Sequence, residues 1–448
     1  MLAIFLMQGV INRAFFDQRA EKDTPGRLAD EFPARSIFEG GGRAGAAAHE
    51  AAHAEDRVKD RASAGASVSA PVSLLLGRPI MRLAMVVARI ALLVVAAVVV
   101  PCLLQAGEVA PASGYSLLSP IRSGNLTVFP VVASKSYDTV EFLTLDEGLR
   151  SGDVVVTEAG QARGLIRHRP RDPVVVHPMR DAEVNRLVLV NNSKRPLLLL
   201  AGEIVTGGKQ DRVIGKDRIV PPESDPVDLS VFCVEPGRWV AANGKVQFSG
   251  GGVGGGVFAA PGVRASAMAA KNQQQVWDSV GKSKDAMAMS VPAQAAAEVN
   301  STTSYARVMD NKEVQEKVKS VAEPVQRNYE SVIRQLHDKN AVGVVVAVNG
   351  EIVWADIFAS TQLLQRYWPK LARSYATEAV VTRAKGGEAS SKDAQKFLNE
   401  LQGRHETAET EPGVYRQSEI TGDGFKVFEL TSLLPKTGFP VHVAKMAD

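Results

Sequence analysis

The stretch from residue 196 to residue 239 constrains the fold most, because three apolar runs are separated there by turn residues. The first run, 197–206, ends at Gly207-Gly208, and an extended pattern resumes at 209–214. Glycine readily adopts the positive φ that a tight turn needs. The pattern therefore predicts an antiparallel hairpin with Gly207 and Gly208 as a two-residue turn.

The predicted hairpin brings polar side chains together on one face of a sheet. With a two-residue turn, Glu203 lies opposite Arg212, and Gln210 shares their face because strand side chains alternate. Two interpretations are open at this point. Either Glu203 and Arg212 form a cross-strand ion pair that fixes the register, or Arg212 binds a phosphate or carboxylate. In the second case Gln210 is a polar ligand and Glu203 a base or an orienting group.

A further strand is predicted at 227–235, with prolines on both sides. Cys233 and Glu235 lie near its end, and Arg238 and Trp239 follow at once. These residue types suit a ligand site, because functional groups are often carried where a rigid strand meets a loop. Trp239 either stacks on a planar ligand beside Arg238 or fills the core.

Cys233 shares a strand face with Leu229 and Val231, which favours an inert buried thiol. As a nucleophile it would need a base, and His442 is a candidate that long-range folding would bring beside it. The five histidines after residue 106 show no HxH, HExxH or His–Cys spacing, so no metal site is predicted there. The sequence identifies no cofactor.

Several motifs resemble those of one protein family. The segment AGEIVTGGKQDRV is followed by VP and then by SVFCVEPGRW, with LTVFPV and TLDEGL upstream and SYATEA and VHVA downstream. This pattern resembles a bacterial domain of unknown function, named for its association with ADP-ribosylglycohydrolases and the rhodanese-phosphatase superfamily, over about residues 115–445. The resemblance implies a link to nucleotide or ADP-ribose metabolism by association alone.

The N-terminal segment differs in composition from the rest of the chain. Residues 1–80 have no sustained apolar stripe and are expected to be a disordered leader or a gene-model artefact. Residues 81–106 combine arginines, an apolar run and small residues after it, which predicts a signal peptide. The alternative is an uncleaved anchor, with membrane contact only through residues 83–104. Both place the remainder outside the cytoplasm, in the periplasm or secreted.

The charge balance argues against a nucleic-acid partner. After Ala106 the chain contains 40 Lys and Arg against 39 Asp and Glu. The segment 249–256 contains G-x-G-x-x-G within a run of glycines, but no clear βαβ unit surrounds it. We therefore expect a loop there and no phosphate cradle.

The predicted fold class is α+β, with two halves packed into one unit. Closely spaced strand patterns predict a β-rich half at 113–247, sandwich or barrel-like. A glycine-rich loop at 248–263 joins it to a mixed helical and antiparallel half at 264–448. In the second half, Asn349-Gly350 predicts a hairpin, and Pro324 and Pro369 predict breaks or kinks in two helices.

The sequence thus predicts an exported protein with a binding or hydrolytic site for a small anionic molecule, nucleotide- or ADP-ribose-like. The polar groups of the predicted site are Glu203, Gln210, Arg212, Glu235 and Arg238. The alternative is a non-catalytic cell-envelope interaction module, in which these residues only brace the β-rich half. Whether the protein is an enzyme and how it oligomerises are not specified by the sequence.

Overall fold

The computed structural model describes residues 114–159, 186–238, 248–250 and 256–448. The predicted leader, the predicted signal peptide or anchor, and Trp239 lie outside these residues. Within the described ranges, no helix is both long enough and apolar enough to cross a membrane. All of the described residues belong to one compact unit.

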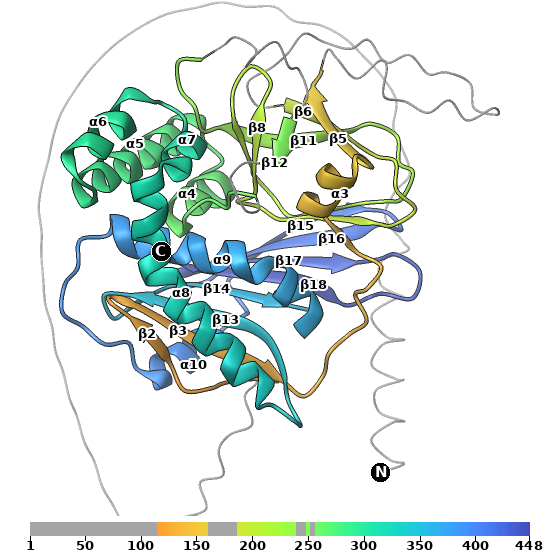
Figure 1. Ribbon diagram of the computed structural model, residues 1–448. Helices are drawn as coiled ribbons and strands as arrows, with labels where there is room; N and C mark the ends of the chain where they lie inside the picture. Colours follow the sequence, from red (N-terminus) through yellow and green to blue (C-terminus); the bar gives the residue numbers. More distant parts are fainter. Residues whose placement is uncertain (1–113, 160–185, 239–247, 251–255) are drawn as a thin grey trace, which may run out of the picture. The chain divides into compact units, whose positions relative to one another are not determined.

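A nine-stranded antiparallel sheet forms the larger layer (Figure 1). Its strand order is β1-β3-β13-β14-β18-β17-β16-β15, and β2 pairs with β3. The strands are β1 (Tyr115–Leu117), β2 (Ile121–Ser123), β3 (Leu126–Ala133), β13 (Asn340–Val348), β14 (Glu351–Phe358), β15 (His405–Glu411), β16 (Tyr415–Thr421), β17 (Phe425–Ser432) and β18 (Pro440–Ala447). Because β1 to β3 come from the first half of the chain, this sheet draws on both predicted halves.

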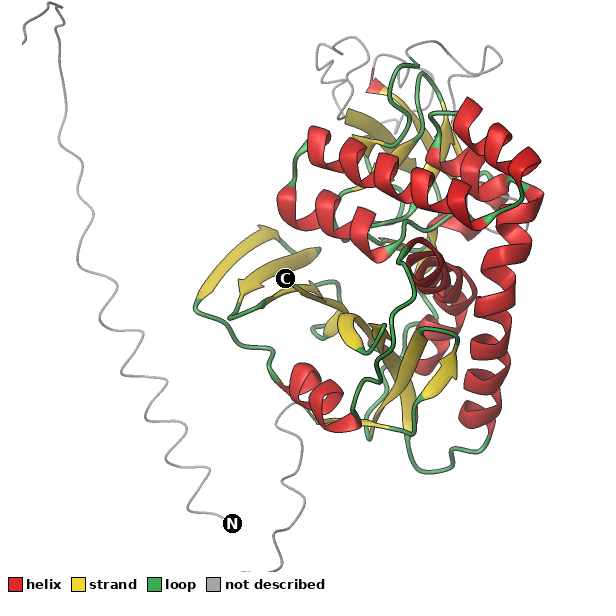
Figure 2. Cartoon of the chain, turned by 90° about the vertical axis from the view of Figure 1, so that its left-hand side faces the viewer, coloured by secondary structure: helices red, strands yellow, loops and turns green. Residues whose placement is uncertain are grey.

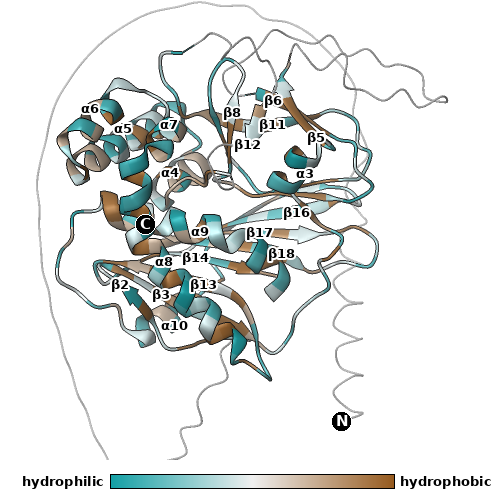
Figure 3. Ribbon diagram, viewed as in Figure 1, coloured by the Kyte–Doolittle hydropathy of each residue, from teal (hydrophilic) through white to brown (hydrophobic). Residues whose placement is uncertain are grey.

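Helices cover both faces of this sheet. α8 (Lys312–Arg334) and α9 (Thr361–Val381) pack on one face, and α10 (Ser391–Asn399) packs on the other (Figure 2). β3 is an almost continuous apolar run and is buried along its whole length, as expected for a strand covered on both faces. In Figure 3 much of the central strands is brown, which marks hydrophobic residues, whereas much of the ribbon of α8 is teal, which marks hydrophilic residues.

Two smaller sheets lie in the β-rich half. The six-stranded sheet has the order β12-β8-β9-β11-β6-β5, and the three-stranded sheet has the order β10-β7-β4. The strands are β4 (Leu143–Thr144), β5 (Val154–Glu158), β6 (Arg186–Asn191), β7 (Leu197–Leu199), β8 (Ile204–Gly207), β9 (Arg212–Ile214), β10 (Arg218–Val220), β11 (Val227–Cys233) and β12 (Phe248–Gly250). The short helix α3 (Leu145–Ser151) is held by a capping box between Thr144 and Glu147.

A helical region follows β12 along the chain. It consists of α4 (Pro261–Ala265), a π-helical turn (Ser266–Ala270), α5 (Gln273–Ser290), α6 (Ala293–Ser301) and α7 (Tyr305–Asp310). Asn272 and Ser304 cap the N-termini of α5 and α7 through their side-chain oxygens. The predicted α+β class with a β-rich first half is confirmed.

The local predictions in the second half have mixed outcomes. The hairpin at Asn349-Gly350 is confirmed, since Val348 pairs with Glu351 across a two-residue turn whose residues both have positive φ. The predicted break near Pro369 is wrong, because α9 runs on through it. α8 also runs on through Pro324, so that helix is not divided and the kink there stays a prediction. Both helices are held by extensive burial against the sheet and each other, which outweighs the local cost of one proline.

Candidate functional site

The central hairpin forms, but its turn is longer than predicted. Val205 on β8 lies opposite Arg212 on β9, so six residues separate this last pair and the predicted two-residue turn is wrong. Residues 208–211 form the loop between the ends of the two strands. The Asp211 side chain accounts for the difference. Its carboxylate accepts a hydrogen bond from the backbone N–H of Gly207 at 3.0 Å and closes the loop.

The predicted pairing of Glu203 with Arg212 is therefore also wrong. Glu203 lies before the β8–β9 ladder and forms an isolated bridge with Phe258. One oxygen of its buried carboxylate accepts the backbone N–H of Leu200 at 2.8 Å, and the other accepts a hydrogen bond from the Lys370 ammonium group. The Glu203 carboxylate thus pairs with Lys370 on α9 and not with Arg212 on β9.

Three of the predicted ligand-binding residues brace the loop at 208–211. Gln210 donates to the backbone carbonyl of Glu235 at 3.1 Å. Arg238 contacts the Glu235 carboxylate at 2.5 Å and donates to the carbonyl oxygen of Gly208 at 2.9 Å. Because these bonds tie the loop to the end of β11, Gln210, Glu235 and Arg238 have a clear structural role.

Arg212 and Cys233 lie opposite each other on β9 and β11, and both are fully buried. Burial lowers the pKa of the Arg212 guanidinium and raises the pKa of the Cys233 thiol. A thiol with a raised pKa is a poor nucleophile at neutral pH, which fits the inert interpretation of Cys233.

His442 does not serve as a base for Cys233, which corrects the predicted catalytic pair. Its Nδ1 lies 2.6 Å from Asp217 Oδ2, and its Nε2 lies 3.1 Å from Asp356 Oδ1. Since each ring nitrogen is already hydrogen-bonded to a carboxylate, neither nitrogen is available to a thiol.

His442 belongs to a buried ionic network that joins four elements of the fold. Arg264 donates to both oxygens of Asp356, at 2.8 and 2.9 Å, and Tyr375 donates to the same carboxylate. Asp217, Arg264, Asp356 and His442 are all completely buried. Such a network carries a large desolvation cost unless every partner is present, and it is closed to solvent, so we interpret it as structural.

The network controls the charge on its members. Burial raises the pKa of Asp356, but Arg264 and His442 outweigh burial and hold that pKa far below its usual range. For His442 burial acts in the opposite direction and lowers the pKa, but Asp217 and Asp356 outweigh burial and raise the pKa to about 9. His442 is therefore protonated at neutral pH.

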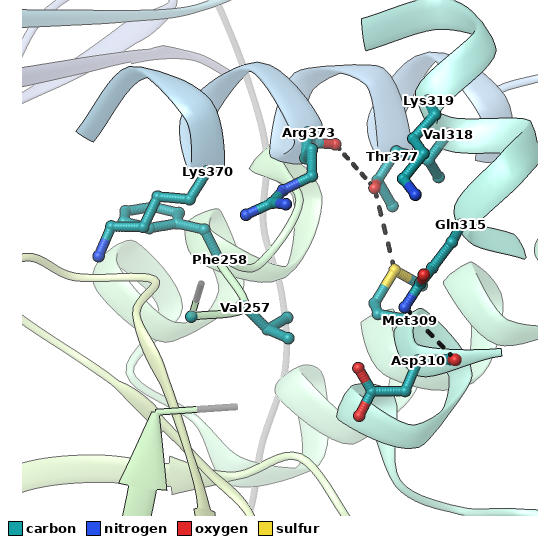
Figure 4. A pocket seen from close by; sticks show the side chains of 11 residues that line it. Val257, Phe258, Met309, Asp310, Gln315, Val318, Lys319, Lys370, Arg373 and Thr377 are labelled. Atoms are coloured by element: carbon teal, nitrogen blue, oxygen red, sulfur yellow. Dashed lines mark hydrogen bonds between the residues drawn. The ribbon is translucent and has the colours of Figure 1, made fainter. Parts of the chain in front are cut away.

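A solvent-accessible pocket lies beside these buried groups, between the end of α7, α8, α9 and the segment 256–258 (Figure 4). Its volume is about 70 Å³. Its walls are partly apolar and partly charged, and the lining residues are Gly256, Val257, Phe258, Met309, Asp310, Gln315, Val318, Lys319, Lys370, Arg373 and Thr377. None of the predicted site residues is among them.

Arg373 is a cation of this pocket with no ion-pair partner among the described residues. Its side chain is half-buried, and among the described residues no hydrogen bond or ion pair satisfies its guanidinium group. Burial lowers the pKa of Arg373, and only the charge of Asp146 opposes this effect. A guanidinium group in such a position gains strongly from a bound anion, because it then recovers the interactions that burial removed.

Lys370 contributes to the same wall but already has partners. Its ammonium group bonds Glu203 and lies 2.9 Å from Asp146, and Figure 4 shows it directed away from Arg373. Burial lowers the pKa of Lys370, but the two carboxylates outweigh burial and raise it. Lys370 is thus a fixed charge in the pocket wall, and Glu203 is the one predicted site residue that reaches the pocket through a neighbour.

Sequence reasoning missed the pocket because its walls come from segments far apart in the chain. Lys370 and Arg373 lie three residues apart within a predicted helix, where cations are usually solvated. Their spacing places them on one face of α9, which was the available signal. Within the described part of the chain, no group of His, Cys, Asp and Glu side chains is arranged to hold a metal ion.

Comparison with known proteins identifies the family. Residues 114–445 match the model of the ARG and Rhodanese-Phosphatase-superfamily-associated Protein domain, which agrees with the resemblance seen in the sequence motifs. Neither curated proteins nor solved structures give a match. Because the match spans most of the chain, this protein belongs to the ARG and Rhodanese-Phosphatase-superfamily-associated Protein domain family.

Proposed function

We propose that this protein is exported and binds a small anionic molecule in the pocket between α7, α8 and α9. The observation that carries the proposal is Arg373, a half-buried guanidinium group that faces the pocket and has no anionic partner among the described residues. Lys319 is a second cation in the lining, and Figure 4 shows it on the neighbouring helix α8. An anion in this pocket is attracted by both side chains.

The proposed site differs from the one expected from the sequence. Gln210, Glu235 and Arg238 are occupied with one another and with the loop at 208–211. We therefore propose that Arg373 binds the anion. The proposed class of ligand is still a phosphate-bearing molecule of the nucleotide or ADP-ribose type. The family name links the domain to such enzymes by association.

Binding is tested with the full chain in a thermal-shift and calorimetric screen of inorganic phosphate, adenosine monophosphate, ADP-ribose and succinate. We expect at least one of these anions to bind and the Arg373→Gln variant to weaken it by about tenfold or more, because a charge-assisted hydrogen bond contributes roughly 1.5–3 kcal/mol. Lys317→Gln is the matched control, since Lys317 is exposed on α8 outside the pocket. Binding that is insensitive to Arg373→Gln contradicts the proposal, and so does the absence of binding by every anion.

Hydrolysis is tested in the same samples. Asp310 is the carboxylate in the lining of the pocket, and a carboxylate in this position can take a proton from water as it attacks the diphosphate of a bound ADP-ribose, which would release two phosphate monoesters. Product formation from ADP-ribose that is lost in Asp310→Asn would make the site catalytic. Anion binding without turnover leaves a binding protein.

Export is the second part of the proposal and rests on residues 81–106, where arginines precede an apolar run and small residues. N-terminal sequencing of the protein recovered from the periplasm or medium should give a start close to residue 107. Recovery in the cytoplasm with residues 81–106 retained would contradict export.

A non-catalytic interaction module at the cell envelope is the second candidate. It is favoured by the way Gln210, Glu235 and Arg238 are used to hold a loop in place, since these residues then need no ligand. An unchanged thermal profile across the whole anion screen, together with a folded protein, would favour this candidate.

A further inference from the structure

We propose that the ligand of the pocket is a phosphorylated sugar or polyol, with its phosphate on Arg373 and Lys319 and its hydroxyl groups on Asp310 and Gln315. This inference rests on the proposed function, because it takes anion binding in this pocket as given. It adds the chemical class of the ligand and identifies Asp310 as a residue that determines specificity. The argument uses the size, the charges and the polar groups of the pocket.

The size of the pocket limits the part of a ligand that it encloses. A volume of about 70 Å³ is compatible with roughly five to seven water molecules, since one water needs about 10–15 Å³ measured in this way. Pockets that enclose drug-sized ligands measure about 300–1,000 Å³. The pocket therefore encloses a molecule of sugar-phosphate size or smaller, and a whole nucleotide would extend beyond it.

The charges of the lining favour a doubly charged group. Lys370 is already shared between Glu203 and Asp146. Arg373 and Lys319 have no ion pair with a described residue. A phosphate monoester, which carries nearly two negative charges at neutral pH, can pair with both of these cations. A single carboxylate balances only one of them.

The other end of the pocket favours hydrogen-bond donors on the ligand. The carboxylate of Asp310 is an acceptor. The Gln315 side chain donates one N–H to the backbone carbonyl of Asp310 at 3.4 Å and has its oxygen and second N–H for a ligand. In Figure 4 the Asp310 carboxylate lies across the pocket from the Arg373 guanidinium. An anionic group on the ligand would be repelled by Asp310, whereas hydroxyl groups can donate to it.

The apolar part of the wall fits the carbon face of a sugar. Val257, Phe258, Met309 and Val318 line the pocket between its charged ends. A polyol presents C–H groups on one side and hydroxyl groups on the other, so one molecule can contact this wall and Asp310 at once. An amino acid also has an anion and a donor, but as a zwitterion it supplies only one negative charge for Arg373 and Lys319.

The inference is tested by calorimetry on the full chain with ribose 5-phosphate, inorganic phosphate, ribose and the zwitterion alanine. We expect ribose 5-phosphate to bind at least tenfold more tightly than inorganic phosphate, and ribose and alanine to bind more weakly than either. Asp310→Asn should lower the preference for ribose 5-phosphate over inorganic phosphate about five- to tenfold, because it removes the acceptor for the sugar hydroxyl groups. Because Asp310 is exposed, this substitution should not disturb folding.

Glu316→Gln is the matched control, since Glu316 is an exposed carboxylate on α8 outside the pocket lining. If ribose 5-phosphate binds no more tightly than inorganic phosphate, the sugar-phosphate assignment is wrong while anion binding stands. Tighter binding of alanine than of ribose 5-phosphate also overturns the assignment. Loss of all anion binding, or binding that Arg373→Gln and Arg373→Lys leave unchanged, overturns the proposed function itself.

Discussion

The buried histidine His442 predicts a pH dependence of stability. Asp217 and Asp356 outweigh burial and raise the pKa of its ring to about 9, against about 6.5 in the unfolded chain. A group whose pKa is raised by folding stabilises the protein fully below pH 6.5 and loses that contribution as the pH rises through 9. The difference in pKa corresponds to about 3 kcal/mol, since one unit is worth about 1.4 kcal/mol.

A second buried group titrates in the same range with the opposite sign. Burial lowers the pKa of Lys445 to about 8, although Glu400 raises it slightly. Burying the charged ammonium group costs free energy of unfolding at low pH. This cost disappears as the pH rises from about 8 to 10.5, because the folded protein can then hold Lys445 in its neutral form. The total pH dependence of the protein therefore combines two opposing effects, and a single titration does not isolate His442.

The Asp217→Asn variant separates the two effects, because it removes one anion beside His442 and leaves Lys445 unchanged. We expect the difference in unfolding free energy between wild type and variant to be largest near pH 6. It should shrink by roughly 1–3 kcal/mol by pH 9.5, as His442 loses its proton. The measurement is urea unfolding of the full chain at several pH values. Asp338→Asn, at an exposed loop position, serves as control, and its difference should stay constant.

The protonation of His442 can also be read directly by NMR of 13C-labelled histidine, with His442→Gln to assign the signal. We expect the ring to remain charged at pH 8 and to titrate near pH 9. A titration close to pH 6.5, or a free-energy difference that is flat from pH 6 to 9.5, would refute the interpretation of the network as ionised.

Two further predictions concern single residues near the proposed site. In Gly256→Ala, the added Cβ would lie 2.3 Å from Asp146 Oδ1, so the carboxylate that bonds Lys370 must shift. We expect the free energy of unfolding, measured in urea, to fall by about 1–3 kcal/mol. The double variant with Asp146→Ala should lose less stability than the sum of the two single variants. Cys233 is completely buried, so site-resolved mass spectrometry should find it alkylated by iodoacetamide far more slowly in the native protein than in urea, and equal rates would count against burial of the thiol.

The parts of the fold that the sequence predicted are those governed by local rules. Asn349-Gly350 forms the expected two-residue turn because both residues adopt positive φ, which Asn and Gly tolerate. Ser360 caps α9 by accepting the backbone N–H of Leu363, a contact between residues three positions apart. In both cases the residues that determine the structure are within a few positions of one another.

The failures of prediction involve long-range contacts. Gly207-Gly208 resembles a two-residue turn, but Asp211 is drawn into the loop by its bonds to Gly207 and to Ser304, which is far away in the sequence. Glu203 similarly bonds Lys370, although Arg212 is much closer along the chain. The local sequence pattern does not show which residues from distant segments will become partners. The predicted hairpin register and the predicted site were therefore both wrong.

The same limit explains why the predicted polar cluster is structural and the pocket is not part of it. Phe258 contacts both the buried network around Asp356 and the pocket wall, since the Arg264 guanidinium lies 4.7 Å and the Lys370 ammonium 5.7 Å from its ring centroid. Each cation is also held by buried carboxylates. The buried network therefore fixes a wall of the pocket, whereas Arg373, which has no such anchor, keeps its charge available for a ligand.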